Sequence, residues 1–401
     1  MLRWFVNNHS GSAPMVGNPY LSAATKLYAH LLRQHWNGQC LVGPDPVGKV
    51  HWRVTRFVRS YLPWLPFDDK YVYLQGQAYW IKANLLMYER YRESRFLYRA
   101  LHCADYMAAV QPPDGAWRHP PIWGRRGFIA TVEGVWASLG LLAAYRYGHR
   151  TWHLDAARKW FDFQLNCMGF IDTGWGLAAR YYLHDKEEVV PNVSAVLLWL
   201  MAELADVTGK SIYLRYAWDV CCFLRKVQMP SGELPYVFPS RKHFQCYQYN
   251  AFQFMDLLAY MKITDDRRVL PILQGLAGYL MSGLSPQGAC RYDCFHQNPE
   301  TNYWTAALAA ALRFAELHNF MAGQRSSCRA YQHLIRRQQG DGRFSFSDKN
   351  YEVLSDHRSY PRQQAMLLYF LLLRGCQGDE TAGTPVGYDP SLPRIVALHQ
   401  M

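Results

Sequence analysis

A short loop motif recurs along the chain about every 55 to 60 residues, and this repeat constrains the fold more than any other feature. In the best copy, Gln111–Trp117, a glycine follows the glutamine after four positions and a tryptophan follows after six. Residues 338–344 repeat the full spacing, and residues 228–232 keep its first two members. The marker glycines are Gly115, Gly174, Gly232, Gly288 and Gly342. A repeat of this length indicates repeated supersecondary units.

Each repeat is predicted to contain two helices. The first is almost entirely apolar, as in residues 128–147, 194–204 and 305–314, so it should be buried on every side. The second has apolar residues three and four apart, as in residues 152–165, which is typical of an outer helix with one solvated face. The amphipathic stretches open at Leu97, Leu154, Leu214 and Leu270. We therefore expect a closed ring of inner and outer helices with little sheet, rather than an open helical array.

The Gln-x-x-x-Gly-x-Trp loops resemble those of the α/α-toroid superfamily, and the resemblance covers roughly residues 65–375. This superfamily includes (α/α)6 glycosidases, polysaccharide lyases, sugar epimerases and the terpene cyclase/prenyltransferase group. The resemblance implies an all-α fold, an (α/α)6 toroid in which six helical hairpins form a double-layered barrel. It also implies that the glutamines and tryptophans of these loops mainly tie helices together.

The continuous repeat predicts one toroidal domain, residues 63–376. Residues 1–62 are expected to form a helical segment, with helices at 20–34 and 51–61, that packs on the ring or completes it. Residues 377–401 contain several glycines and prolines, and we expect an irregular C-terminal tail there.

Composition limits the location and the partners of the chain. Residues 1–8 lack the apolar region of a signal peptide, and no uncharged apolar run is long enough to span a membrane. Ten cysteines without a secretory signal are typical of reduced thiols in a cytoplasmic protein.

The net charge is +12, and arginine contributes 32 of the 43 basic residues. Arginine binds carboxylates and phosphates through two-point contacts, although a compositional habit of the genome explains the bias equally well. No nucleic-acid-binding motif accompanies the charge, and the oligomeric state is left open.

Loops that enter the inner helices of a toroid gather at one mouth of the ring, so we expect a single cavity and the functional site there. Aromatic rings stack on sugar faces, amides bind hydroxyls and arginine binds carboxylates, so the side chains of these loops suit a sugar with an acidic group. The predicted substrate-binding residues are Tyr73, Gln77, Arg126, Trp175, Arg180, Asn192, Asn250, Arg291, Trp304 and Arg358. The predicted catalytic residues are Glu133, Tyr249, Asp293, His357 and Tyr360.

Two reaction types fit this site about equally well. Glycoside hydrolysis needs two carboxyl groups, for which the candidates are Glu133, Asp172, Asp293 and Asp356. Glu133 lies within an apolar helix, where an unpaired charge is costly, so it is either functional or a capping residue. Proton abstraction beside a uronate carboxylate, as in a lyase or a C5-epimerase, needs a base, an acid and a cation. Residues 357–360 offer histidine, arginine and tyrosine together.

Two short stretches are similar to the glucuronyl C5-epimerases. Residues 74–78, Leu-Gln-Gly-Gln-Ala, resemble the Gln-Gly-Gln-Ala stretch of that family. Arg358, Tyr360 and Gln363 are similar to its C-terminal helix, which carries arginine and tyrosine. The histidines that follow the tyrosine in that family are missing from this chain. The Asn-Asn-His-Ser-Tyr-Trp pattern of toroidal alginate lyases is also absent.

Other chemistries have weaker support. The Asp-x-Asp-Asp and Asp-Asp-x-x-Asp motifs of terpene cyclases are absent, although apolar inner helices remain compatible with an isoprenoid pocket. Cys290, Cys294 and His296 lie close in sequence, with Cys246 as a further ligand, but the spacing lacks a clear partner pair for zinc. We therefore predict no metal and no cofactor. The sequence favours a carbohydrate-active enzyme for an acidic, uronate-type oligo- or polysaccharide. The alternatives are an isoprenoid cyclase-like enzyme and a non-catalytic glycan-binding toroid.

Overall fold

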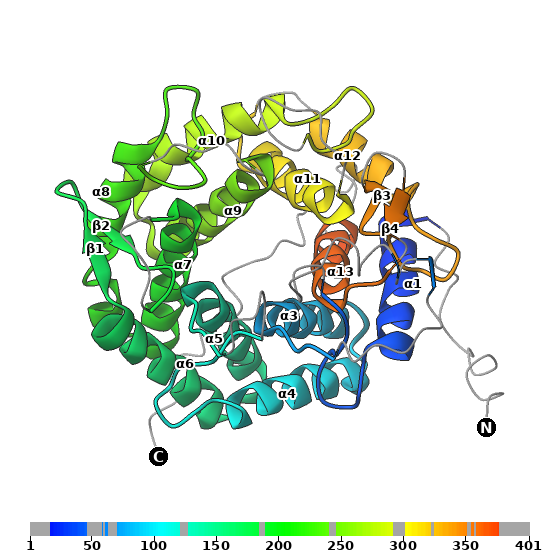
Figure 1. Cartoon of the computed structure of the whole chain (residues 1–401), viewed down its shortest axis with the longest axis horizontal. Helices are drawn as coiled ribbons and strands as arrows, with labels where there is room; N and C mark the ends of the chain where they lie inside the picture. Colours follow the sequence, from blue (N-terminus) through cyan, green and yellow to red (C-terminus); the bar gives the residue numbers. More distant parts are fainter. Residues whose placement is uncertain are drawn as a thin grey trace, which may run out of the picture.

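The chain forms a closed ring of helices in two layers (Figure 1). The computed structural model describes residues 17–45, 58, 61–62, 70–120, 127–183, 189–239, 246–291, 301–321, 325–350, 354–356 and 358–376. The predicted all-α toroid is confirmed, and the open helical array is excluded, because the last inner helix packs against the first. None of the described helices combines the length and the apolarity that a membrane crossing requires.

The inner layer consists of apolar helices that follow one another around the ring. They are α3 (Leu74–Tyr91), α5 (Thr131–Gly148), α7 (Pro191–Thr208), α9 (Cys246–Thr264), α11 (Asn302–Leu317) and α13 (Pro361–Cys376). Each helix packs against the next, and α13 packs against α3 to close the ring. Residues 193–204 of α7 are all buried, as expected of a helix that is apolar on every side.

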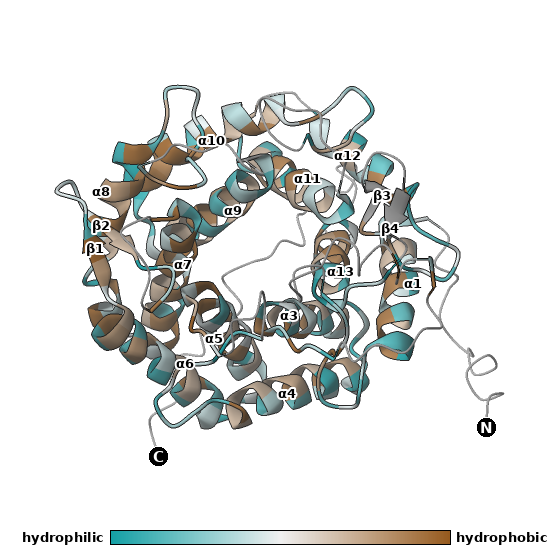
Figure 2. Ribbon diagram, viewed as in Figure 1, coloured by the Kyte–Doolittle hydropathy of each residue, from teal (hydrophilic) through white to brown (hydrophobic). Residues whose placement is uncertain are grey.

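The outer layer consists of amphipathic helices that cover the inner ones. They are α1 (Pro19–Gln34), α4 (Ser94–Ala109), α6 (Thr151–Phe163), α8 (Ala217–Val227), α10 (Leu270–Ser282) and α12 (Ser326–Ile335). Hydrophilic and hydrophobic residues alternate along α4, because one face is solvated and the other packs on the ring (Figure 2). The first outer helix, α1, packs against α13 and α12, so it is the outer partner of the last inner helix.

Strands are few and short in the described part of the chain. The hairpin β1 (Phe170–Asp172) and β2 (Leu177–Ala179) is antiparallel, with Phe170 opposite Ala179. A second antiparallel pair, β3 (Ser347–Asn350) and β4 (Leu354–Asp356), precedes α13.

The loop glutamines of three repeats tie an outer helix to the next one, as the superfamily resemblance implies. Gln111 Nε2 donates hydrogen bonds to the carbonyl oxygen of Gly115 in its own loop (3.0 Å) and to that of Ala156 in α6 (2.9 Å). Gln228 makes the same pair of bonds to its own loop and to α10, and Gln338 makes them to its own loop and to α1. The repeated motif is therefore a repeated hydrogen-bonded clamp between neighbouring hairpins.

The marker glycines adopt a backbone conformation that other residues rarely adopt. Their φ angles lie between +78° and +99°. A Cβ atom on Gly115 would lie 2.8 Å from the carbonyl oxygen of Lys159 in α6, and one on Gly342 would overlap the carbonyl oxygen of Lys26 in α1. In the stretched copy, Gly174 has open space around it, and Gly176 makes the close approach to α8 instead. Glycine is thus required both by the turn and by the contact between hairpins.

Some helix boundaries differ from those expected. The helix predicted at 128–147 begins at Thr131, because Ala130 forms a β-bridge with Tyr182. The helix predicted at 152–165 ends at Phe163 and continues as a π-helical turn, Gln164–Met168. Most of the helix predicted at 51–61 and all of the tail at 377–401 lie outside the described residues.

A buried polar cluster joins α1 to the segment that leads into α13. The Ser359 hydroxyl lies 2.9 Å from His30 Nε2 and 2.8 Å from His35 Nε2. His35 Nδ1 lies 3.2 Å from the carbonyl oxygen of Val42 and donates to it, so its Nε2 accepts the hydroxyl proton. Burial lowers the pKa of His35 to about 4, and burial also lowers the pKa of His30. The cluster is therefore stable with neutral rings.

We expect acid to destabilise the ring through His35. Its pKa is about 4 in the folded chain and 6.5 when unperturbed, so between these values the unfolded chain binds more protons. The free energy of unfolding should fall by about 3 kcal/mol as the pH drops through this window, and should rise as the pH returns to neutral. Urea unfolding at a series of pH values measures this slope. The His35→Gln variant should show a shallower slope, and an unchanged slope in that variant would contradict the assignment.

Candidate functional site

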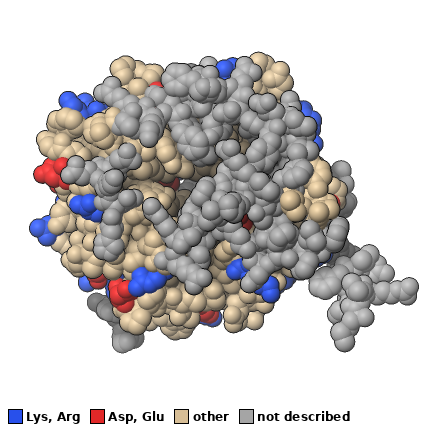
Figure 3. Space-filling view, viewed as in Figure 1, with Lys and Arg blue, Asp and Glu red and all other residues tan. Residues whose placement is uncertain are grey.

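The inner helices all begin at one end of the ring, which we call the mouth. Each inner helix is followed by an outer helix that returns, so the inner helices run in the same direction and present their N-termini together. Contacts between first turns confirm this convergence: Glu133 of α5 reaches the start of α3, and Arg362 of α13 covers the ring of Tyr73. On the face seen in Figure 3, charged side chains are scattered over the described surface and form no single basic patch.

A buried ion pair lies at the mouth. Arg362 Nε is 2.8 Å from Asp45 Oδ2, and Arg362 Nη2 is 3.0 Å from Asp45 Oδ1. Burial alone would lower the pKa of Arg362, but the Asp45 carboxylate raises it above its ordinary value. The guanidinium carbon lies 4.4 Å from the centre of the Tyr73 ring. Arg362 is thus permanently charged, and its ion pair and hydrogen bond with Asp45 fix its position.

The Tyr73 hydroxyl is buried but makes no hydrogen bond to any described residue. The side chain belongs to the residue just before α3, and only 4% of its surface is exposed. Burial raises the pKa of Tyr73 well above its usual value, so the phenol keeps its proton at neutral pH. A buried polar group without a partner is costly, so this hydroxyl is available to bond with a group outside the described residues.

Glu133 is buried in the first turn of α5, and its carboxylate serves the neighbouring helix. Its Oε2 accepts hydrogen bonds from the backbone N–H groups of Leu74 (3.0 Å) and Gln75 (3.4 Å). These groups are at the N-terminus of α3, where a negative charge is favoured. This capping contact accounts for the burial of Glu133 without any catalytic role, and its predicted catalytic role stays a prediction.

His119 completes the group around Tyr73. Its Nδ1 lies 2.9 Å from the carbonyl oxygen of Pro120 and donates to it, so Nε2 faces Glu133 Oε1 at 3.7 Å. The imidazole stacks on Phe128 at 4.4 Å and meets the Tyr73 ring edge-on at 5.2 Å. Sequence reasoning missed both His119 and Asp45. The available signal was position, because His119 follows the marker tryptophan by two residues.

Several half-buried tyrosines lie after β2 and at the starts of α9 and α11. The rings of Tyr236 and Tyr249 lie 4.9 Å apart, and those of Tyr181 and Tyr182 lie 4.2 Å apart. Burial raises the pKa of Tyr249 and of Tyr181 well above the usual value, and it also raises the pKa of Tyr303. These phenols therefore stay protonated and can act as hydrogen-bond or proton donors.

Two amides that were predicted to bind sugar hydroxyls are engaged by the backbone. Gln77 bonds to both the N–H and the carbonyl of Leu41, at 2.8 Å each. Asn250 holds Leu234 in the same way, at 2.7 and 3.1 Å, and Gln364 holds Phe344. These amides stabilise the loops of the mouth. In contrast, Asn192 in the first turn of α7 has a buried Oδ1 with no partner among the described residues.

The remaining predicted residues are not all brought together. Trp304 and Tyr360 are buried at the starts of α11 and α13, and the Arg358 guanidinium carbon lies 5.2 Å from the centre of the Tyr360 ring. Arg180 is half-buried after β2, and Arg291 is exposed beyond α10. Trp175 is half-exposed at the β1–β2 turn, on the outer rim of the ring. Arg126, Asp293 and His357 lie outside the described residues.

The described residues contain no group of three or more side chains that could hold a metal ion. The Cys290 thiol is buried and donates to the carbonyl oxygen of Arg291 at 3.3 Å. Cys294 and His296 are outside the described residues, so the structure describes only part of the cluster that the sequence suggested.

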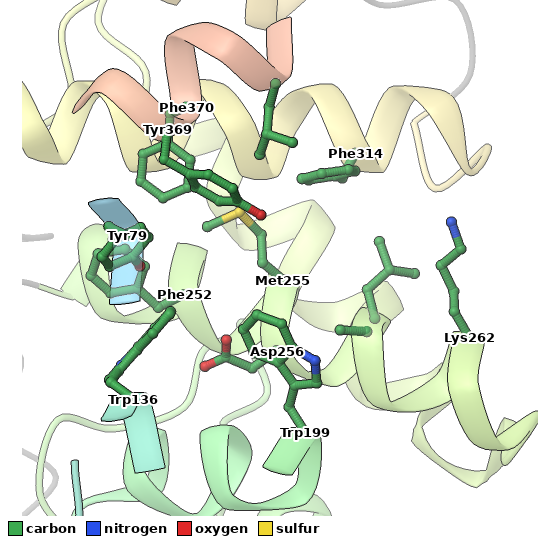
Figure 4. A pocket seen from close by; sticks show the side chains of 13 residues that line it. Tyr79, Trp136, Trp199, Phe252, Met255, Asp256, Lys262, Phe314, Tyr369 and Phe370 are labelled. Carbon is green, nitrogen blue, oxygen red and sulfur yellow. The ribbon is translucent and has the colours of Figure 1, made fainter. Parts of the chain in front are cut away.

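A small apolar cavity lies inside the ring, below the mouth (Figure 4). Its volume is about 60 Å³, and aromatic side chains of the inner helices form most of its wall. The Asp256 carboxyl group points into it between Trp136 and Trp199, and burial raises the pKa of Asp256 well above its usual range. Lys82 Nζ lies 3.8 Å from the centre of a Trp199 ring, and burial lowers the pKa of Lys82 to about 8.

Comparison with known proteins identifies the fold. No family model matches the chain, and neither does any curated protein sequence. A sugar epimerase from a ruminal bacterium matches with a TM-score of 0.66 over 89% of this chain and 99% of its own, at 13% identity. A polysaccharide lyase matches with a TM-score of 0.58 (88% and 97%, 13% identity), and a possible member of glycoside hydrolase family 105 from Salmonella enterica with 0.62 (91% and 97%, 12% identity). The chain therefore has the six-hairpin α/α-toroid fold that these carbohydrate-active proteins share.

Proposed function

We propose that this chain is a carbohydrate-active enzyme that acts on an acidic, uronate-type glycan by proton abstraction, as a lyase or an epimerase. The fold is shared with a sugar epimerase and a polysaccharide lyase, which makes a carbohydrate substrate the natural first hypothesis. The observation that carries the choice of reaction is the buried Tyr73 hydroxyl, which has no partner among the described residues and lies in a group with a histidine and an arginine.

Proton abstraction beside a carboxylate requires three tasks, and the mouth offers a residue for each. A base removes the proton from the carbon that bears the carboxylate, and His119 suits this task because its Nδ1 is fixed as the donor to Pro120. An acid delivers a proton, either to the departing glycosidic oxygen or to the opposite face of the same carbon, and Tyr73 suits this task because its phenol stays protonated. A cation binds the carboxylate while negative charge builds up, and we assign this task to Arg358, whose guanidinium carbon lies 5.2 Å from the Tyr360 ring at the start of α13.

Hydrolysis is less well supported by the described residues. It needs two carboxyl groups on either side of the scissile bond. Asp45 is bound to Arg362, Glu133 caps α3, and Asp172 is exposed on the outer hairpin. The tyrosine-rich mouth therefore favours proton transfer by phenol and imidazole groups over catalysis by a carboxyl pair.

An isoprenoid cyclase-like function is also less well supported. The aromatic cavity with Asp256, whose pKa is raised by burial, resembles a site for carbocation chemistry, but its volume is only about 60 Å³. A cavity of about 150 Å³ is what holds a single benzene ring in a protein interior. An isoprenoid chain is larger than that.

Incubation with acidic oligosaccharides in heavy water tests the proposal. A lyase product carries a new double bond conjugated to the carboxylate and absorbs ultraviolet light. An epimerase instead incorporates deuterium at the carbon beside the carboxylate, which nuclear magnetic resonance detects. New reducing ends without either signal would indicate hydrolysis, and binding without turnover would indicate a glycan-binding toroid. Turnover of neutral oligosaccharides alone would overturn the acidic-substrate assignment.

A further inference from the structure

A line of aromatic side chains runs from the mouth to the outer rim of the ring. It starts at Tyr249 in the first turn of α9, whose ring lies 4.9 Å from that of Tyr236. Phe238 follows two positions later and forms a β-bridge with Val189, so the backbone is extended there. Val237, between Tyr236 and Phe238, is buried. The Phe238 ring lies 6.1 Å from that of Trp175.

Trp175, at the outer end of this line, is held in place although it is half-exposed. It sits in the turn between β1 and β2, and 51% of its surface is exposed. The neighbouring Gly176 lies so close to α8 that a Cβ atom would overlap the carbonyl oxygen of Asp219. A fixed, solvent-exposed indole is a platform on which the apolar face of a sugar can stack.

The charges beside Trp175 favour an anionic partner. Lys226 Nζ lies 5.3 Å from the centre of a Trp175 ring, and Arg225 is also exposed in the last turn of α8. The acidic residue of the hairpin, Asp172, uses one carboxylate oxygen to accept a hydrogen bond from the backbone N–H of Gly174 at 2.9 Å. The exposed end of α8 thus places the Lys226 cation beside the indole, with Arg225 next to it in the chain.

We infer that Tyr249, Tyr236, Phe238 and Trp175 form an extended binding track, which carries the part of an acidic polysaccharide that reaches beyond the mouth. This inference rests on the proposed function, and it adds that the substrate is a polymer rather than a short oligosaccharide. Sugar units stack along the aromatic rings, and Lys226 and Arg225 bind carboxylates at the outer end. Short substrates fill the mouth without reaching Trp175.

Two tryptophan variants test the track. Trp175→Ala should lower the affinity for an acidic polysaccharide relative to an acidic trisaccharide by roughly tenfold, the order expected for one exposed aromatic contact. Trp152→Ala is the matched control, because Trp152 is also 51% exposed but lies in the first turn of α6, at the end of the ring opposite the mouth. Its polymer-to-trisaccharide affinity ratio should equal that of the wild type. Affinity electrophoresis in gels that contain polygalacturonate, alginate or hyaluronate gives the dissociation constants for the polymers. Calorimetry gives the dissociation constants for the trisaccharides.

The outcomes separate the track from the proposed function. An acidic polymer that binds the wild type and Trp175→Ala equally well would overturn the track and leave the proposed function standing. An equal loss of affinity in the two variants would also overturn the track, because it would not depend on position. Failure of the wild type to bind or convert any acidic glycan would overturn both. Thermal unfolding of each variant identifies any loss of affinity that reflects misfolding. If Trp175→Ala misfolds, Trp175→Phe, which keeps an aromatic ring, should fold normally but recover only part of the polymer-to-trisaccharide affinity ratio.

Discussion

Replacing Tyr73 with phenylalanine is expected to lower turnover of an acidic oligosaccharide by about two to four orders of magnitude, the usual contribution of a positioned proton donor. The same change should leave the free energy of unfolding unchanged or slightly higher. The reason is that the Tyr73 hydroxyl is buried and makes no hydrogen bond to a described residue, so its removal breaks none of these contacts. Steady-state kinetics and urea unfolding of the same preparation measure the two effects.

Tyr331→Phe provides the matched control for this prediction. The Tyr331 hydroxyl is also buried, but it donates to the carbonyl oxygen of Phe370 at 3.1 Å, between α12 and α13. Its loss should cost about 1 kcal/mol of stability and leave turnover at the wild-type level. Tyr73→Phe should therefore lower turnover without loss of stability, whereas Tyr331→Phe should lower stability without loss of turnover. Normal turnover in Tyr73→Phe would remove Tyr73 from the mechanism and with it the main support for proton abstraction.

Gly342→Ala should be among the most destabilising single substitutions in the chain, with an expected loss of about 3 kcal/mol or more. Gly342 has a φ of +95°, and an added Cβ atom would overlap the carbonyl oxygen of Lys26 in α1. The added Cβ atom is fixed to the loop backbone, and the Lys26 oxygen is part of the α1 backbone. The overlap can therefore be relieved only by separating the loop from α1. The unfolding midpoint in urea measures the effect.

Gly174→Ala separates the two causes of this loss. Gly174 also has a positive φ, +78°, but nothing lies within 4 Å of an added Cβ atom. Only the conformational cost remains there, which is about 1 kcal/mol. Equal losses in the two variants would show that the close approach to α1 contributes nothing to stability, and the marker loops would then act through their turns alone.

The fold could be predicted from the sequence because its determinants are local and repeated. The loops at Gly115, Gly232 and Gly342 state the same requirement within a few residues: a glutamine that clamps the next outer helix and a glycine with positive φ that lies against it. The apolar inner helices were equally visible, since a helix buried on all sides has no polar face. These patterns can be recognised within one repeat, without knowing which distant segments of the chain contact each other.

The site was predictable only in its location. Asp45 and Arg362 are 317 positions apart and meet because the ring closes, which no local pattern records. Gln77 and Asn250 were expected to bind sugar because amides often do, but composition does not reveal that Leu41 and Leu234 already occupy their hydrogen-bonding groups. Glu133 was singled out correctly as an unusual buried charge, yet its contact with the start of α3 depends on the neighbouring hairpin.

The position of α1 has a consequence for synthesis on the ribosome. Its main partners, α12 and α13, are the last helices of the ring to be made, and Gln338 and Gly342 dock on it only after almost the whole ring has emerged. During translation Tyr28 of α1 can pack on Trp80 and Phe96 of the next two helices, but the contacts of α1 with α12, α13 and Gln338 form only after about 300 further residues. A nascent chain with such a delay leaves part of the hydrophobic surface of α1 exposed for most of its synthesis, which favours misassembly and chaperone binding.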